Sequence, residues 1–183
     1  MTEHSKPLSV VAVSGTLHRP SKTGAVIDAV LERVAEATSA DLEVIELLDL
    51  AGPLADALSG GEADAALADA YARVAGADLL VVATPVYKGS YTGLLKLFVD
   101  QLGQDSLAGT PVLLAAVGGS LQHALVIEHA LRPLFGFFRA DTVATGIYAT
   151  GADFVDGVVG SGPLRETIAA AVAEGLGRVP AAG

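Results

Sequence analysis

Three apolar runs, each followed at once by a loop of small, polar and glycine residues, constrain the fold of this chain most strongly. The runs are Leu8–Ser14, Asp78–Thr84 and Pro111–Val117, and the last two show no alternation with polar residues. Runs of this kind are typical of strands covered on both faces, as in a parallel sheet. Ligands bind such sheets just outside the carboxyl ends of the strands, where the strand order reverses. The three loops therefore predict one composite binding site.

Segments with the apolar spacing of helices lie between the strands. We predict helices over Lys22–Ala37, Glu62–Ala75, Gly93–Leu102, Leu121–Phe138 and Pro163–Gly177. We predict two further strands, Leu42–Leu47 and Thr142–Ala149, and a connection at Ala51–Gly61 that contains proline and glycine. This alternation predicts an α/β fold with one domain over residues 1–183, in which a five-stranded parallel sheet carries helices on both faces.

Charge and composition narrow the partners and the compartment. The formal net charge of −10 argues against binding to nucleic acid or to an anionic membrane surface. No uninterrupted apolar segment approaches the ~20 residues that a membrane span needs. The chain has no cysteine, which excludes disulfides and thiolate metal sites, and four scattered histidines predict no metal site. We expect a cytoplasmic protein.

The first loop, S-G-T-L-H-R-P-S-K-T at Ser14–Thr23, has the composition of a phosphate site. Gly15 can adopt backbone angles that other residues avoid, and Ser21 stands where the next helix needs an N-cap. Free amides at a helix start favour a phosphate. Hydroxyl groups and cations that could assist are those of Ser14, Thr16, Arg19, Ser21, Lys22 and Thr23. The alternative is an ordinary loop with a serine cap, since neither a dinucleotide fingerprint nor a P-loop is present.

The second loop, P-V-Y-K-G-S-Y-T-G at Pro85–Gly93, suits a flat ring. Pro85 fixes the exit from the strand, and Gly89 allows the backbone to approach a ligand closely. Exposed amides around Tyr87–Ser90 could bind the pyrimidine edge of a flavin. Alternatively, Tyr87 anchors packing and Lys88 is a solvated charge.

The third loop begins with Gly118 and Gly119, which would leave space beside a planar ring or would only make a turn. A phosphate site and a ring site together make a mononucleotide such as FMN the leading candidate ligand.

Pro133 lies inside the predicted helix Leu121–Phe138. Proline removes one helical hydrogen bond and crowds the carbonyl four residues earlier, which belongs to His129. We therefore predict a kink or a π-bulge at this turn, and such bulges often lie at functional sites. The alternative is that His129 is an ordinary surface or interface histidine, and His123 is equally ambiguous.

With these residues in view, the chain resembles the NAD(P)H-dependent FMN reductase family, and most closely the reductases of two-component alkanesulfonate and methanesulfonate monooxygenases. The resemblance rests on Ser14–Thr23, on T-P-V-Y-K-G-S-Y-T-G-L-L-K at Thr84–Lys96, and on G-G-S-L-Q-H-A-L at Gly118–Leu125. One departure is Thr16-Leu17-His18, where the family often has Ser-Pro-Arg. The resemblance implies a flavodoxin-like three-layer sandwich with strand order 2-1-3-4-5, and a homodimer or homotetramer.

The resemblance also implies the roles of the site residues. The FMN phosphate would be held by Ser14, Arg19, Ser21 and Thr23, with Thr16 beside them. The isoalloxazine would be flanked by Pro85, Val86, Tyr87, Lys88, Gly89 and Ser90, and approached on its far side by Gly118 and Gly119. In the resembling reductases an inserted aromatic residue near the position of His129 forms a π-helix at the subunit interface.

The function that follows is reduction of FMN by NAD(P)H, with reduced FMN supplied to a flavin-dependent monooxygenase. No protein side chain is predicted to be catalytic, because flavin N5 accepts the hydride directly. Two alternatives stay open. One is an enzyme that retains FMN and reduces quinones or azo dyes, and the other is a flavodoxin-type electron carrier.

Overall fold

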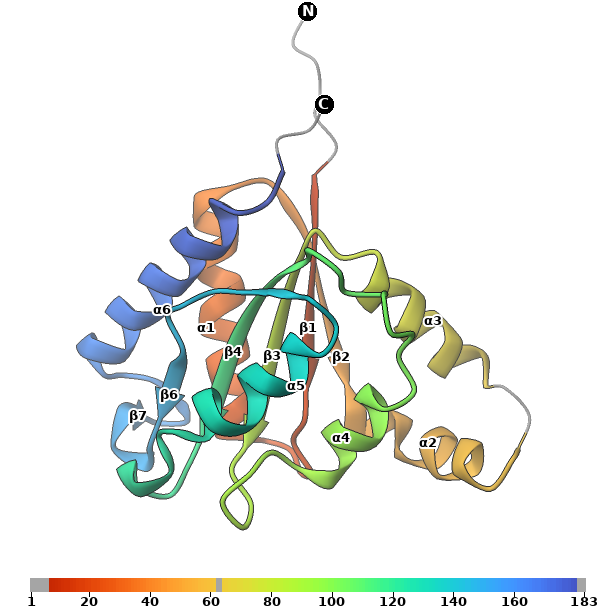
Figure 1. Cartoon of the computed structure of the whole chain (residues 1–183). Helices are drawn as coiled ribbons and strands as arrows, with labels where there is room; N and C mark the ends of the chain where they lie inside the picture. The colour runs from red at the N-terminus through yellow and green to blue at the C-terminus, as the bar shows by residue number, and fades with distance from the viewer. Residues whose placement is uncertain (1–6, 62–63, 181–183) are drawn as a thin grey trace, which may run out of the picture.

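A parallel β-sheet runs through the centre of the computed structural model, which describes residues 7–61 and 64–180 (Figure 1). The strands pair in the order β2-β1-β3-β4-β5, and a sixth strand, β6, also pairs with β4. The strands are β1 (Leu8–Ser14), β2 (Ala40–Glu46), β3 (Leu79–Pro85), β4 (Pro111–Val117), β5 (Asp141–Thr142) and β6 (Ile147–Ala149). The predicted α/β fold with order 2-1-3-4-5 is thus confirmed.

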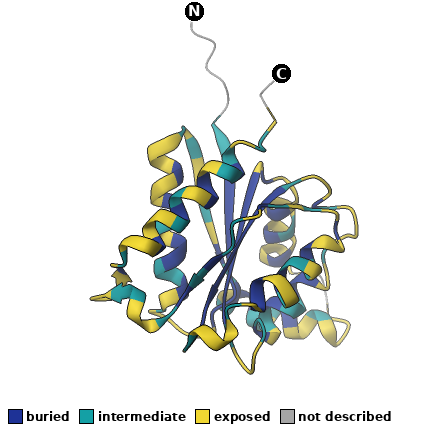
Figure 2. Ribbon diagram, turned by 60° about the vertical axis from the view of Figure 1, so that its left-hand side comes forward, coloured by how far each residue is buried: buried dark blue, intermediate teal, exposed yellow. Residues whose placement is uncertain are grey.

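Helices cover both faces of the sheet and close two separate cores (Figure 2). One core packs α1 (Lys22–Ala37) and α6 (Gly162–Leu176) against the sheet. The opposite core takes buried side chains from α2 (Ala51–Leu58), α3 (Ala65–Ala75), α4 (Gly93–Val99) and α5 (Arg132–Gly136). Every residue of β3 and β4 is buried, which is why these two strands read as continuous apolar runs.

The predicted strand Thr142–Ala149 is interrupted, so β5 and β6 are two short pieces on the same flank of β4. Between them, the amides of Ala144 and Thr145 donate to the carboxylate of Glu174 in α6, at 2.7 and 3.0 Å. Gly146 then passes Ile127 so closely that a Cβ would lie 2.9 Å from the Ile127 Cγ2 atom. A side chain from another element satisfies the backbone here, so the strand ladder is not needed.

The segment Ala51–Gly61 is not the plain connection that we predicted, because α2 occupies most of it after a short 3₁₀-helix, η1 (Leu47–Leu50). Pro53 falls in the first turn of α2, where its missing amide hydrogen leaves no helical bond unmade. Leu54 is fully buried and fastens the helix to the core. The next helix, α3, begins at Ala65 after its cap Asp64, and the predicted start at Glu62 lies outside the described residues.

The predicted helix Leu121–Phe138 is also not continuous. It consists of a 3₁₀-turn, η2 (Leu121–His123), a π-helix, η3 (Ile127–Leu131), and the short helix α5. The π-helix occupies the turn at which Pro133 predicts a kink or bulge, and it contains His129. Arg132 ties this segment to the sheet, because its guanidinium donates to the carbonyls of Val143 and Ala144 at 2.7 and 3.2 Å.

A small antiparallel hairpin follows β6 and was not predicted. After the 3₁₀-turn η4 (Gly151–Asp153), β7 (Phe154–Val155) pairs with β8 (Val158–Val159). Asp156 and Gly157 form its turn with φ values of 49° and 84°. Two-residue turns with positive φ match the twist of a hairpin.

Candidate functional site

The three predicted loops leave the same edge of the sheet and are bonded to one another. Strand pairing places the ends of β1, β3 and β4 side by side. The Thr92 hydroxyl in the second loop donates to the carbonyl of Gly15 in the first, at 2.8 Å. The Val86 amide donates to the carbonyl of Val117, just before the third loop, also at 2.8 Å. The structure therefore brings the loops together as one surface.

The first loop runs from the end of β1 to the start of α1. The Ser21 hydroxyl caps this helix by accepting from the amide of Gly24 at 3.0 Å, so its own proton is left to donate. The first amides of a helix have no partner within it. The Ser14 hydroxyl is fully buried and has no hydrogen-bond partner among the described residues. An orphaned hydroxyl and a helix start within one loop fit an oxyanion such as a phosphate.

Two other residues of this loop act differently from the prediction. Gly15 does not use left-handed backbone angles; instead, a Cβ there would lie 3.2 Å from the Leu95 Cβ and 3.3 Å from the Thr84 Oγ1. It is therefore a glycine because β1, β3 and α4 meet there. The Thr16 hydroxyl donates to the carbonyl of His18 at 3.1 Å, so its proton already has an acceptor.

The two cations of the first loop point to protein partners. The guanidinium of Arg19 forms an ion pair with the carboxylate of Asp49 in η1. The Asp49 carboxylate raises the pKa of Arg19, first through this hydrogen bond and then through its charge. The ammonium of Lys22 lies 5.7 Å from the centre of the Phe154 ring, in the β7 strand. Sequence reasoning missed Asp49 because it follows a different strand.

The second loop is a tight turn. The amide of Tyr87 donates to the carbonyl of Ser90 at 2.9 Å, and the amide of Ser90 donates back at 3.2 Å. Lys88 and Gly89 form the tip, with φ values of 53° and 80°. We predicted that the amides around Tyr87–Ser90 bind the ring edge, but those of Tyr87 and Ser90 are already bonded within the turn. The amides of Lys88 and Gly89 bond to no other described residue.

Thr84 and Thr92 hold this turn from below, and sequence reasoning did not assign them a role. Both are buried, and the hydroxyl of Thr84 accepts from the amide of Thr92 at 3.2 Å. Thr92 also caps α4. The Tyr87 hydroxyl lies 3.4 Å from Nδ1 of His18, and this contact links the second loop to the first. Tyr87 is 39% exposed, so it does not serve as a packing anchor.

In the third loop the need for glycine at position 118 comes from Tyr148. A Cβ on Gly118 would lie 1.9 Å from the Tyr148 hydroxyl oxygen. That hydroxyl donates to the carbonyl of Ser120 at 2.6 Å, and burial raises the pKa of Tyr148. Gly119 is exposed, and a Cβ there would meet no atom within 4 Å. Tyr148 thus supports the loop from β6, a role for which no local pattern in the sequence gives evidence.

His129 lines a groove of about 670 Å³ between α4 and the π-helix, and Tyr91 of the second loop lines the same groove. Apolar side chains of Ala130, Leu134 and Phe137 line the same groove, and Phe137 is 65% exposed. The lining includes none of the residues predicted to bind FMN. His123 is exposed in the 3₁₀-turn after the third loop.

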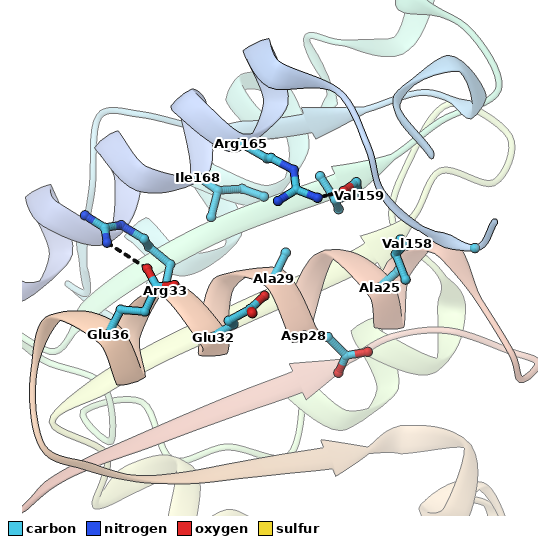
Figure 3. Close-up of a pocket in the computed structure, with 11 residues that line it drawn as sticks. Ala25, Asp28, Ala29, Glu32, Arg33, Glu36, Val158, Val159, Arg165 and Ile168 are labelled. Atoms are coloured by element: carbon cyan, nitrogen blue, oxygen red, sulfur yellow. Dashed lines mark hydrogen bonds and ion pairs between the residues drawn. The ribbon is translucent and has the colours of Figure 1, made fainter. Parts of the chain in front are cut away.

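A second groove, of about 620 Å³, lies between α1, α6 and the hairpin, and it also contains none of the predicted site residues (Figure 3). Its rim carries an exposed ion pair between Arg33 and Glu36, whose atoms are 2.9 Å apart. Across residues 7–61 and 64–180, acidic, histidine and cysteine side chains form no cluster of three that could hold a metal ion. No helix in that part of the chain has the length and apolar character to cross a membrane.

Comparisons with known proteins show what the whole chain is similar to. The family model described as NADPH-dependent FMN reductase matches residues 8–155. Over 164 residues the chain is 49% identical to the NADH-dependent FMN reductase SfnF of Pseudomonas fluorescens and 46% identical to an FMN reductase (NADPH) of Pseudomonas aeruginosa. Each alignment covers 90% of this chain and 88% of the relative.

A similar solved structure is the apo form of the NADH:FMN oxidoreductase EMOB, with a TM-score of 0.86 at 32% identity. The match covers 96% of this chain and 91% of that one.

Proposed function

This chain belongs to the NADPH-dependent FMN reductase family, and we propose that the three bonded loops at the carboxyl edge of its sheet form its FMN site. The chain is an NAD(P)H-dependent FMN reductase. The observation that carries the proposed location is the orphaned, buried hydroxyl of Ser14 at the end of β1, in the loop that leads to the first amides of α1. A phosphate group would satisfy both kinds of donor at once.

We assign the phosphate end of the site to Ser14, Arg19, Ser21 and Thr23. Ser21 would donate its free proton while its oxygen keeps the cap on α1. Thr16 shapes the loop through its bond to His18 and has no free proton to offer.

We assign the ring end to the turn at the tip of the second loop. The amides of Lys88 and Gly89 would donate to the ring edge, and Pro85, Val86, Tyr87 and Ser90 would hold the turn that presents them. Gly118 and Gly119 would border the other side of the ring. FMN, when bound, supplies the hydride chemistry itself, so the protein only binds, orients and excludes water.

The phosphate assignment is tested by replacing Arg19 with alanine and titrating FMN and riboflavin in parallel. A charge-assisted hydrogen bond is stronger than a neutral one, so FMN should bind about tenfold more weakly or worse. Riboflavin, which lacks the phosphate, should bind as before. Equal loss of both ligands would place Arg19 away from the phosphate.

We further propose that reduced FMN leaves the site for a flavin-dependent monooxygenase, in the cytoplasm. The exposed tip of the second loop supports this, because Tyr87, Lys88 and Gly89 are all open to solvent. Steady-state oxidation of NAD(P)H should then depend on added FMN as a substrate. Ping-pong kinetics with a retained flavin and a quinone would instead favour the flavin-retaining reductase, and no turnover would favour an electron carrier.

We also propose that the chain forms a homodimer or homotetramer through the groove beside the π-helix. Phe137 lines this groove and is 65% exposed, and Leu125, two residues before the π-helix, is 61% exposed. Large exposed apolar side chains suit a subunit interface. A second copy is the occupant to which the resemblance points. Sedimentation of the Phe137→Glu variant as a smaller species would support this interface, and unchanged sedimentation would oppose it.

A further inference from the structure

The cation assigned to the FMN phosphate is already engaged by a carboxylate. The Nη1 atom of Arg19 lies 3.2 Å from Oδ2 of Asp49, and Nη2 contacts Oδ1, so the guanidinium faces Asp49 as a fork. Asp49 follows β2, which pairs directly with β1 in the sheet. The two loops therefore lie side by side, and the pair spans them.

A second carboxylate adds to this arrangement. Glu46, the last residue of β2, is paired in register with Ser14, and its Oε2 atom is buried without a partner among the described residues. The charge of Glu46 also raises the pKa of Arg19, although less than Asp49 does. The guanidinium thus pairs with one carboxylate and lies within the field of a second, so both negative charges oppose an approaching phosphate. This is unlike a site built for permanent retention of an anion.

We infer that Asp49 sets the affinity for FMN by competing with its phosphate for Arg19, which keeps the flavin exchangeable. The inference rests on the proposed phosphate site. A guanidinium has five N–H donors in a fixed fork, so Arg19 can share itself between the carboxylate and a phosphate. Sharing weakens the attraction between Arg19 and the phosphate, and the charge of Asp49 repels the phosphate directly. Low affinity suits a reductase that must give its product flavin away.

The test is the Asp49→Asn variant, because asparagine keeps the size and the acceptor oxygen while it removes the charge. We expect the dissociation constant of FMN to fall by about three- to fivefold, the range set by exposed ion pairs. The KM for FMN should fall with it, and riboflavin binding should stay unchanged. The gain should shrink as ionic strength rises, because exposed charges are screened.

A matched control is available in the groove of Figure 3. Arg33 and Glu36 form an ion pair with side chains 45% and 58% exposed, against 45% and 61% for Arg19 and Asp49. Glu36 lies near the far end of α1, about 22 Å of helix from Ser21. The Glu36→Gln variant changes the net charge by the same amount and should leave FMN affinity as it was. An equal gain in this control would reduce the effect of Asp49 to overall charge and overturn the inference.

Further outcomes separate the inference from the site on which it rests. Suppose that Asp49→Asn weakens FMN binding or leaves it unchanged, while Arg19→Ala still selectively weakens FMN binding. Asp49 then only orients Arg19 or has no effect on it, and the inference is wrong. If Arg19→Ala affects FMN and riboflavin alike, the phosphate site itself is misplaced. In the Arg19→Ala background, Asp49→Asn should give a smaller gain than in the parent, because the contested cation is gone.

Discussion

Gly118 offers the sharpest test of how the third loop is built. In the Gly118→Ala variant, the new Cβ would lie 1.9 Å from the Tyr148 hydroxyl oxygen and 2.9 Å from its Cζ atom. Real carbon–oxygen contacts are longer by well over 1 Å, and both atoms belong to the one Tyr148 side chain. The tyrosine ring must therefore move, and its 2.6 Å hydrogen bond to the Ser120 carbonyl must break.

Two contributions set the expected loss of stability. Overpacking a well-packed site destabilises by about 1–3 kcal/mol. A lost neutral hydrogen bond adds about 0.5–1.5 kcal/mol. Gly118→Ala should therefore lower the free energy of unfolding by about 2–4 kcal/mol, measured by urea denaturation.

The matched background is Tyr148→Ala, which removes the ring that the methyl group would strike. In that background Gly118→Ala should lower the free energy of unfolding by no more than about 0.5 kcal/mol, because contacting residues are not additive. A loss of the same size in both backgrounds would refute the reasoning. FMN titration of the double variant then separates a second role: restored stability without FMN binding would mean that Gly118 must also face the flavin.

Three other predictions follow from the contacts described above. Gly89→Val should lose FMN binding and about 1–2 kcal/mol of stability, because φ is 80° there; FMN titration and urea denaturation measure both, and parental FMN affinity would contradict the ring assignment. Arg132→Met should lower the free energy of unfolding by about 1–3 kcal/mol in urea, since it frees the carbonyls of Val143 and Ala144. The amides of Thr145 and Ala144 hold the pKa of Glu174 below its ordinary value of 4.5. The ionised carboxylate therefore stabilises the fold above that pH, and this stabilisation is lost as the pH falls through the lowered pKa. In acid denaturation, the difference in free energy of unfolding between the parent and Glu174→Gln should narrow as the pH falls.

Much of the sheet could be predicted because burial on both faces leaves a direct record in the sequence. The predicted β1, β4 and α1 have the observed bounds, and the predicted third strand is displaced by one residue. In α1 the apolar spacing, the serine cap and the change to polar residues at the end all agree. Where local preference and tertiary burial agree, a pattern of residues is sufficient.

The errors in the fold share a different cause. In Ala51–Leu58, proline and glycine suggested a connection, yet burial of Leu54 made the segment a helix. In the last strand, Glu174 of α6 takes the amides that a strand ladder would otherwise use. Both outcomes depend on contacts with distant parts of the chain, which local composition does not contain.

The same distinction applies to the site, where residue type identified the loops but not the free atoms within them. Thr16 was a candidate phosphate ligand by type, yet its proton is bound to the carbonyl of His18. The amides of Tyr87 and Ser90 were candidates for binding the ring, yet each donates to the carbonyl of the other residue. A donor that already has an acceptor adds little net free energy when a ligand replaces that acceptor. The selective binding of FMN should therefore depend on the few groups that remain unpaired or contested, which are the Ser14 hydroxyl, the α1 amides, the tip of the second loop and Arg19.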